Sequence, residues 1–416
     1  MSNNRVTVAL DFLGCKLNQA EIEELGRQLA GAGYAIVPAD QPADIYILNT
    51  CTVTHIADRK SRQLLRQAHR RNPSARLIAI GCYAEREPEL LKSLEGVDLV
   101  IGNERKNELA ELLGPAAILT DPKVIHERTR SIVKVQEGCR NRCAYCIVPL
   151  VRNRVASVPA DEVIRTIREL ETEGRREVVL TGTEIGTYQD GDADMRRLLE
   201  RILAETNIER LRISSLQPPE ISAGLVALWR DPRLCPHFHL SLQSGSDAVL
   251  RRMKRRYDLA RYRETIGLIR SDVPDAAVTT DIIVGFPGET EDEFEESLQT
   301  CRELAFARIH VFSYSSRPGT GAETMPDQVP ETVKKERSRR MQELADASAR
   351  RFREKFMGRE MQVLFEQRDG GTWTGYTGNY IKVYVKIERD LSNNILPVTL
   401  EKLHRDGLQG YLGNID

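Results

Sequence analysis

Alternating apolar and amphipathic segments divide the first part of the chain into strands and helices. Short apolar runs at residues 6–10, 45–48, 77–80 and 99–101 indicate strands, and helical periodicity covers residues 19–32 and 57–71. Strands that alternate with helices in this way predict βαβ units with a parallel sheet. We therefore expect residues 1–118 to form an N-terminal domain, a small parallel sheet covered by helices.

A second and longer series of the same kind follows a polar connector at residues 119–130. Its strand-like runs lie at residues 132–135, 178–181, 211–214, 239–242, 278–284 and 309–312, and helical patterns such as 160–172 and 292–303 separate them. Six βα units in succession predict a partial parallel barrel. We expect this (βα)6 domain to cover residues 125–354.

The pattern changes again after a basic helical segment at residues 333–356. Runs typical of strands at residues 363–365, 380–385 and 396–400 are separated by glycine-containing turns. Residues 357–416 are therefore expected to form a small β-barrel. The whole chain is assigned to the α/β class.

Composition is typical of a globular protein and leaves nucleic-acid binding to local patches. Of the 416 residues, 41% are hydrophobic and 29% charged, and 60 basic residues face 61 acidic ones for a net charge of -1. Such a balance supplies no global basic field to attract nucleic acid. Local excesses of basic residues occur at residues 59–71, 250–263 and 333–356. These are candidate phosphate contacts or simply solvated helix faces.

The chain is expected to stay in the cytoplasm and to have no membrane partner. No run approaches the roughly 18–20 apolar residues of a membrane span, and the first residues contain no apolar signal-peptide core. Thiols are kept reduced in that compartment. The eight cysteines are therefore not assigned to disulfides.

Three of these cysteines each follow a predicted strand of the first domain. Cys15, Cys51 and Cys82 come shortly after the runs at residues 6–10, 45–48 and 77–80. Ligands of open parallel sheets bind at the carboxyl ends of the strands. The three thiols are therefore expected to converge on one edge of the sheet, the alternative being three unrelated buried cysteines.

A second trio is closely spaced. Cys139, Cys143 and Cys146 have the spacing C-x3-C-x2-C directly after a predicted strand. Three thiolates on one loop can hold three corners of a [4Fe-4S] cluster and leave one iron open for a small ligand. Zinc is the alternative, but a structural zinc site normally has four ligands and no histidine completes a conventional spacing here. Cys235 and Cys301 lie outside both groups and are expected to be buried structural thiols.

The spacing of this second trio, on the first βα loop of a parallel barrel, resembles the radical S-adenosylmethionine (SAM) superfamily. The resemblance implies that SAM chelates the open iron and that its reductive cleavage yields a 5′-deoxyadenosyl radical, with the three cysteines as catalytic residues. It also implies cofactor contacts from residues on this loop and after later strands, for which structural roles are the alternative: Tyr145, Gly182, Thr183, Glu184, Gln243 and Asp281.

Further blocks narrow the resemblance to the methylthiotransferase family within that superfamily, over nearly the whole chain. They lie at residues 13–19, 49–54, 81–85, 179–186, 240–245 and 281–290. The resemblance implies a second, auxiliary [4Fe-4S] cluster on Cys15, Cys51 and Cys82. It also implies that the last module is similar to the RNA-binding TRAM domain. There Trp373, Tyr376 and Tyr380 are candidates either to stack on bases or to fill the barrel core.

Membership of this family implies a reaction and its partners. A C–H bond is replaced by C–SCH3 with two equivalents of SAM, and the substrates of the family are adenosine 37 in the anticodon loop of tRNA or an aspartate of a ribosomal protein. The blocks at residues 49–54, 180–182 and 313–320 most resemble the branch that modifies C2 of N6-threonylcarbamoyladenosine. The isopentenyladenosine branch and the ribosomal-protein branch are alternatives. An electron donor such as flavodoxin or ferredoxin and a sulfur donor are also implied.

One loop departs from the family pattern. The family has an aromatic residue at the position of Leu150, glycine at that of Asn153 and arginine at that of Val158. Arg152 and Arg154 still make the loop basic on its expected substrate side. A hypothesis of a different class is a non-catalytic RNA-binding or metal-sensing protein that uses its clusters structurally. His237 and His239 are expected in core or surface roles rather than as ligands.

Overall fold

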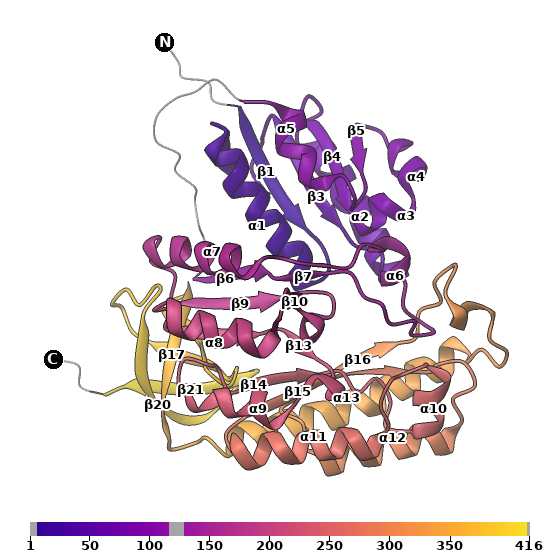
Figure 1. The fold of residues 1–416 in the computed structure, drawn as a ribbon, viewed down its shortest axis with the longest axis vertical. Helices are drawn as coiled ribbons and strands as arrows, with labels where there is room; N and C mark the ends of the chain where they lie inside the picture. Colours follow the sequence, from indigo (N-terminus) through magenta and orange to yellow (C-terminus); the bar gives the residue numbers. More distant parts are fainter. Residues whose placement is uncertain (1–5, 116–128, 414–416) are drawn as a thin grey trace.

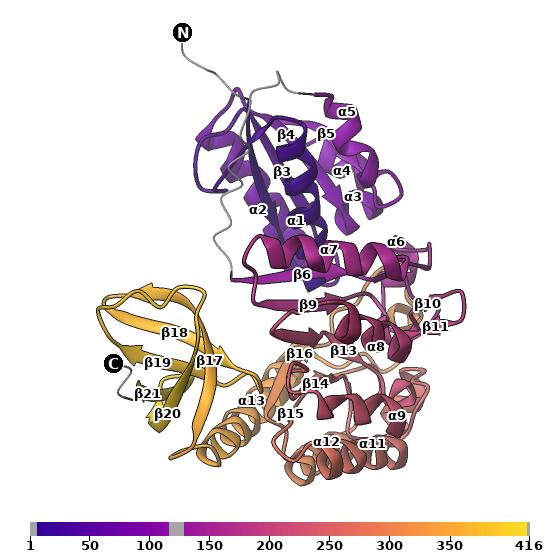
Figure 2. The ribbon, with the colours of Figure 1, turned by 60° about the vertical axis from the view of Figure 1, so that its left-hand side comes forward.

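A computed structural model of the chain describes residues 6–115 and 129–413, which form three structural units (Figures 1 and 2). In Figure 1 the N-terminal unit lies at the top, the central sheet with its helices below it, and the C-terminal barrel at the lower left. The expected boundaries at residues 118 and 125 fall outside the described residues. None of the helices in the described ranges has the length and hydropathy that a membrane-spanning helix needs.

The N-terminal unit is a five-stranded parallel sheet of order β2-β1-β3-β4-β5. One strand, β2, was not expected from the sequence, because it has three residues and all are only half-buried. The elements of the unit are β1 (Thr7–Phe12), α1 (Lys16–Gly31), β2 (Ala35–Val37), β3 (Ile45–Thr50), α2 (His55–Arg71), β4 (Arg76–Gly81), α3 (Cys82–Arg86), α4 (Pro88–Lys92), β5 (Val97–Ile101) and α5 (Leu109–Leu113).

Helices cover both faces of this sheet, which explains why its strands are continuous apolar runs. Along β3, Ile45 and Ile47 pack with residues of α1 and α5, whereas Tyr46 and Leu48 pack with residues of α2 and α3 on the other face. Successive side chains of a strand point to opposite faces, so a strand covered on both sides must be apolar throughout. The carboxyl ends of β1, β3 and β4 are thereby held at one edge.

The central unit is a six-stranded parallel half-barrel, as expected. Its strands pair in the order β6-β9-β12 and β13-β14-β15-β16. Because Ser214 alone separates β12 from β13, these two are counted as one interrupted strand. No pairing joins β6 to β16 within the described ranges. The strands are β6 (Arg130–Lys134), β9 (Glu177–Thr181), β12 (Arg210–Ile213), β13 (Ser215–Leu216), β14 (His237–Leu240), β15 (Ala277–Val284) and β16 (Arg308–Ser313).

Helices cover the outer face of the half-barrel and bury one large apolar core between themselves and the sheet. The last of them, α13, packs against β16 and leads into the C-terminal barrel (Figure 2). The helices and short strands are β7 (Gln136–Glu137), α6 (Val148–Val151), β8 (Ala156–Ser157), α7 (Ala160–Thr172), β10 (Gln189–Asp190), β11 (Ala193–Asp194), α8 (Met195–Glu205), α9 (Ala223–Val226), α10 (Asp247–Arg252), α11 (Leu259–Asp272), α12 (Glu291–Leu304) and α13 (Glu331–Glu354). Cys235 and Cys301 are buried free thiols, as expected.

The C-terminal unit is a closed barrel of order β17-β18-β19-β21-β20. The sequence pattern missed β18 because its inward positions include Gly375 and Thr377, which break the apolar alternation. Gly375 is needed there, since a Cβ atom would lie 2.3 Å from the carbonyl oxygen of Leu364. The strands are β17 (Glu360–Asp369), β18 (Thr372–Thr377), β19 (Lys382–Lys386), β20 (Ile395–His404) and β21 (Gly407–Leu412).

The three aromatic candidates of this barrel have different roles. Trp373 is buried in the barrel core, where its indole N–H donates to the carbonyl of Arg389 at 2.9 Å. Tyr380 lies between the barrel and the half-barrel: the Arg212 guanidinium sits 4.1 Å from its ring centroid, and Arg130 donates to its hydroxyl at 2.6 Å. Trp373 is therefore part of the barrel core, whereas Tyr380 is half-buried and lines the cavity described below. Tyr376 lines the cavity described below.

Candidate active site

The cysteine loop of the half-barrel begins directly after β7 at Gly138. This glycine has φ +78°, and a Cβ atom there would lie 2.1 Å from the carbonyl oxygen of Arg154, so glycine is required. The loop then folds back on itself, with the N–H of Asn141 donating to the Cys139 Sγ at 3.3 Å and the N–H of Cys146 to the carbonyl of Cys143 at 3.1 Å. The thiols are thus held on one short loop.

The chemistry of this loop fits an iron–sulfur cluster. Burial, and then a hydrogen bond to Glu184, raise the pKa of Cys139 to about 12, and burial raises the pKa of Cys146 to about 11. The neighbouring thiols contribute in the same direction, which is consistent with sulfur atoms that face a common centre. Soft thiolates are the ligands of such clusters, and metal binding replaces their protons. The three thiols and their spacing therefore match a three-cysteine [4Fe-4S] site.

Two arginines of the predicted basic segment contact this loop, Arg255 half-buried and Arg256 exposed. Arg255 donates to the Cys143 Sγ at 3.1 Å and to the Tyr145 hydroxyl at 3.3 Å. Arg256 donates to the side chain of Asn141 at 3.1 Å. Reasoning from the sequence had treated both only as part of a charged stripe, and the excess of basic residues at 250–263 was the signal available. A hydrogen-bond donor to a cluster sulfur is a means of tuning its potential.

The block after β9, which the resemblance implied to contact the cofactor, packs directly against the cysteine loop. The Thr183 hydroxyl accepts from the N–H of Gly138 at 3.1 Å, and the Cys139 thiol donates to the Glu184 carboxylate at 3.1 Å. Gly182 allows this approach, since a Cβ atom there would lie 2.9 Å from the Gln136 Oε1. Tyr145 packs edge-on against Phe286. Four of the six expected cofactor contacts therefore surround the loop.

Of the other two, Gln243 follows a strand as expected, whereas Asp281 does not. Gln243 comes three residues after β14 with φ +71°, and its backbone bridges to Ile282. Asp281 lies in the middle of β15, three residues before its end. The expectation that it follows a strand was wrong, since both the predicted run at residues 278–284 and the observed strand extend beyond the aspartate. Asp281 instead accepts hydrogen bonds from His239 and Ser241.

The N-terminal trio converges on one wall of a cavity. Cys15 immediately precedes α1, Cys51 follows β3 and Cys82 begins α3 directly after β4. Gly14 packs so closely that a Cβ atom would lie 2.7 Å from the Cys51 Sγ. Burial raises the pKa of Cys51 to about 12, and the thiols of Cys15 and Cys82 add to the shift. A second three-thiol set, suited to soft-metal ligation, therefore faces the half-barrel.

Arg152 is buried beside this trio, not at the substrate surface where the loop sequence had placed it. Its side chain is 2% exposed and joins the N-terminal unit to the half-barrel. Burial alone would raise the pKa of Glu21, but Arg152 and then Lys106 hold it well below its usual range. Arg152 donates to Glu21 and Glu137 at 2.7 Å, to Asn18 at 2.9 Å and to the Cys82 Sγ at 3.3 Å.

Replacing Arg152 by methionine is expected to lower the free energy of unfolding by about 3–5 kcal/mol, because it leaves buried carboxylates short of a partner. The anaerobic denaturation midpoint of the full chain measures this. Arg154→Met is the matched control, since Arg154 lies two residues away and is exposed. Equal, small shifts for both variants would contradict the assigned role of Arg152.

One cavity of about 1460 Å³ joins these features. It exceeds the roughly 300–1,000 Å³ of an ordinary small-molecule pocket. Its walls come from all three units: the N-terminal thiols, the residues Gly182 and Thr183 beside the second cysteine loop, the inner face of β14–β16, and the rim of the C-terminal barrel. The N-terminal thiols line this cavity themselves, whereas the loop of Cys139 adjoins it through Gly182 and Thr183.

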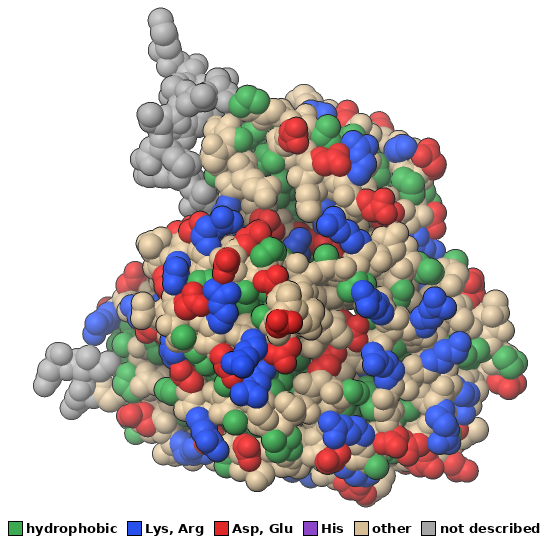
Figure 3. Space-filling model, in the orientation of Figure 1, with side chains coloured by type: hydrophobic (Ala, Val, Ile, Leu, Met, Phe, Trp, Pro, Cys, Tyr) green, Lys and Arg blue, Asp and Glu red, His purple; other side chains and the backbone are tan. Residues whose placement is uncertain are grey.

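The basic segments differ in how many of their side chains are paired with acidic residues. Arg337 and Arg340 of α13 pair with Glu289, Glu291 and Glu295 at or near the start of α12. Figure 3 shows basic and acidic side chains interspersed on the face that it draws. On α2, by contrast, Arg59, Lys60, Arg66 and Arg70 are exposed and make no side-chain hydrogen bond or ion pair within the described residues. The strongest phosphate-contact candidate is therefore α2.

Comparisons with known proteins agree with this architecture. A model described as "Radical SAM superfamily" matches residues 133–301, and one described as "Uncharacterized protein family UPF0004" matches residues 7–102. Among solved structures, the radical SAM methyltransferase TsrM from Kitasatospora setae superposes with a TM-score of 0.57 at 14% identity, covering 77% of each chain. At that identity the likeness shows the fold.

Sequence relatives are more specific. The threonylcarbamoyladenosine tRNA methylthiotransferases MtaB of Bacillus subtilis and Thermotoga maritima are 36% and 38% identical, covering 95% and 90% of this chain and 94% and 90% of their own. The tRNA-2-methylthio-N(6)-dimethylallyladenosine synthase of Endomicrobium trichonymphae is 32% identical, covering 96% of this chain and 98% of its own. The chain therefore belongs to the tRNA methylthiotransferase family of radical SAM enzymes, which transfer a methylthio group and use SAM and a [4Fe-4S] cluster.

Proposed function

We propose that this enzyme methylthiolates C2 of N6-threonylcarbamoyladenosine at position 37 of tRNA, in the cytoplasm. One observation carries the proposal: a single cavity is lined by the N-terminal thiol trio and by the block that contacts the second cysteine loop. Several relatives at 34–38% identity are named as threonylcarbamoyladenosine tRNA methylthiotransferases, which favours this nucleoside over the isopentenyl one. The isopentenyl branch is the weaker alternative, with relatives at 32% and 35% identity.

Cys139, Cys143 and Cys146 are proposed to hold the cluster that binds SAM, and Cys15, Cys51 and Cys82 to hold a second [4Fe-4S] cluster. Each set has three thiols, which leaves one iron open. When bound, the first cluster and SAM supply a radical that can break a C–H bond. The geometry of the N-terminal trio supports a sulfur-carrying role, because its thiols face the cavity from the side opposite the half-barrel.

The remaining site residues are proposed to position these groups. Glu184 and Thr183 lie against the cysteine loop and can accept hydrogen bonds from a bound amino group. Gln243 and Tyr145 are proposed as further SAM contacts, on the strength of their closeness to Ile282 and Phe286 beside that loop. An electron donor such as flavodoxin or ferredoxin and a sulfur donor complete the proposed reaction.

Nucleoside mass spectrometry of tRNA tests the substrate. In cells that lack the protein, 2-methylthio-N6-threonylcarbamoyladenosine should be absent and its unthiolated precursor should accumulate, and restoring the gene should reverse both changes. The isopentenyl analogue in the same digest is the internal control and should not change. Loss of that analogue instead would move the enzyme to the other branch, and no change in either nucleoside would point to a protein substrate.

A further inference from the structure

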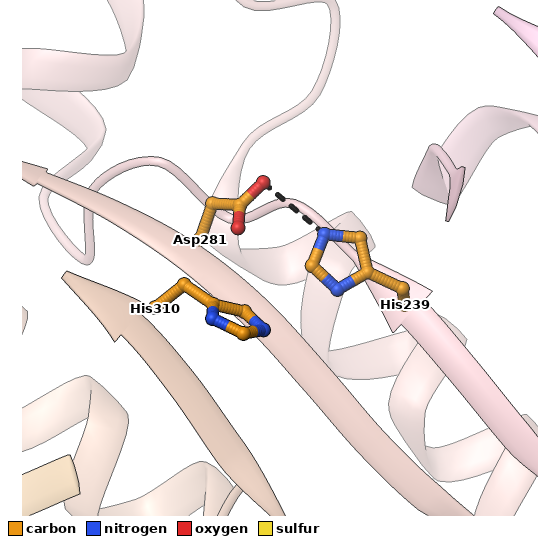
Figure 4. A group of neighbouring side chains, drawn as sticks. All are labelled: His239, Asp281 and His310. Atoms are coloured by element: carbon orange, nitrogen blue, oxygen red, sulfur yellow. Dashed lines mark hydrogen bonds and ion pairs between the residues drawn. The ribbon is translucent and has the colours of Figure 1, made fainter. Parts of the chain in front are cut away.

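A row of polar side chains covers the inner wall of the cavity on three adjacent strands. In the parallel pairing, His239 of β14 lies beside Thr279 of β15, and Asp281 of β15 lies beside His310 of β16. Paired residues and every second residue share a face of a sheet. His239, Asp281 and His310 therefore point toward one another (Figure 4), and their ligand atoms all lie within 4.8 Å.

Part of this cluster is already satisfied by hydrogen bonds. The His239 Nδ1 lies 2.9 Å from the Thr279 Oγ1, and its Nε2 lies 3.1 Å from the Asp281 Oδ2. Ser241 donates to the same carboxylate oxygen at 2.9 Å. Both bonds end on Oδ2, so the other carboxylate oxygen has no hydrogen bond within the described residues. His239 is thus fixed, and Asp281 retains an acceptor.

Two further side chains of the same wall, Arg308 and His310, make no hydrogen bond or ion pair within the part of the chain that the structure describes, although the His310 ring contacts that of His239. Arg308 of β16 is paired with Thr279 of β15 and lies two residues before His310. Arg308 and His310 therefore lie on the same face of the sheet as the cluster. Arg308 and His310 both line the cavity. Arg308 is solvent-exposed at the mouth of this cavity. An arginine whose five donors make no bond to the protein is suited to a carboxylate, which it can bind with two parallel hydrogen bonds.

We infer that Arg308, His310 and Asp281 form the subsite for the threonylcarbamoyl group on N6 of the substrate adenosine; this rests on the proposed function. Arg308 pairs with the threonine carboxylate, His310 donates to or accepts from the same substituent, and Asp281 accepts from its hydroxyl or urea N–H. An isopentenyl group has no polar atom for these residues. Sites built for hydrogen bonds reject analogues that lack them, because their own polar groups are left unpaired.

A pair of matched RNAs tests the subsite. We would use the full-length, iron-loaded protein and a tRNA anticodon stem-loop carrying N6-threonylcarbamoyladenosine, together with the same RNA whose threonine carboxylate has been converted to a neutral amide. The Kd of each RNA is measured first, and kcat/KM for the methylthio product second. The unmodified protein should bind the carboxylate RNA about 10- to 100-fold more tightly, the range expected for a hydrogen bond to a charged group.

Arg308→Gln should bring the ratio of the two Kd values close to one. It should weaken binding of the carboxylate RNA and change binding of the amide RNA little. His310→Phe should lower the ratio in the same direction and serves if the first variant does not load iron. Arg405→Gln is the control: Arg405 lines the same cavity from the C-terminal barrel, and its loss should leave the ratio unchanged.

Three outcomes overturn the subsite. The first is a Kd ratio near one in the protein without substitutions. The second is an equal loss of affinity for both RNAs in Arg308→Gln. The third is one bound zinc ion per chain that is lost in His310→Phe, which would make the cluster a metal site. Failure of the proposed function looks different. The protein would then bind and convert an isopentenyladenosine stem-loop and would leave both threonylcarbamoyl RNAs unconverted.

Discussion

Replacing Cys143 by alanine should abolish the release of 5′-deoxyadenosine from SAM under a strong reductant. Cys143 accepts a hydrogen bond from Arg255 at 3.1 Å and is one of three thiols on the loop. Loss of an outer partner of a metal ligand commonly costs about 10- to 100-fold, so loss of a ligand itself should exceed about 100-fold. Quantifying 5′-deoxyadenosine by liquid chromatography after anaerobic reconstitution measures the effect.

The matched control for this result is Cys301→Ala. Cys301 is a free thiol of α12, fully buried among apolar residues and outside both trios. Its loss removes one sulfur atom from the core and should leave 5′-deoxyadenosine release and iron content unchanged. Full release by the Cys143 variant would show that these cysteines do not hold the SAM-binding cluster, whatever the family resemblance implies.

Those features that depend on chain direction and strand order could be predicted from the sequence. A cysteine that follows an apolar strand must lie at the carboxyl edge of the sheet, so Cys15, Cys51 and Cys82 had to approach one another once the strands were recognised. The parallel half-barrel followed from six βα repeats. These inferences need only element order, which local periodicity carries. Gly182, Thr183 and Glu184 were expected near the cofactor only because of the family resemblance.

Features that depend on which way a side chain points could not be predicted. Arg152 and Arg154 are two residues apart in one basic loop, but the first is buried among carboxylates and the second is exposed. Asp281, His239 and His310 are far apart in the sequence and meet only through the register of three parallel strands. A one-residue change in that register would turn each side chain to the other face of the sheet.

Net charge along a segment was likewise a poor guide to an RNA-binding face. Residues 333–356 have nine basic residues against four acidic ones, yet the acidic first turn of α12 pairs with Arg337 and Arg340 across the interhelical contact. The acidic residues come from another part of the chain, so a count along one helix could not include them. On α2, by contrast, Arg59, Lys60, Arg66 and Arg70 are exposed and have no acidic partner within the described residues, so the excess that the sequence shows is kept there.

Replacing Cys15 by alanine should separate the two halves of the reaction. Cys15 is the exposed thiol of the N-terminal trio, so its loss disturbs packing less than loss of Cys51 or Cys82, which are buried. If the trio holds a second cluster, iron should fall from about eight to about four atoms per chain. Release of 5′-deoxyadenosine should continue, since the other three cysteines are intact, while methylthiolated product should fall by more than about 100-fold.

The measurement takes iron content, 5′-deoxyadenosine and methylthiolated nucleoside from one anaerobic reaction, with Cys235→Ala as the control because Cys235 is buried outside both trios. The ratio of product to 5′-deoxyadenosine is decisive. A protein that was merely unfolded would lose both quantities together, whereas loss of a sulfur-carrying cluster lowers the ratio alone. If the Cys15 variant keeps eight irons and the full ratio, the N-terminal trio has no auxiliary role, and the sulfur must reach the cavity by another route.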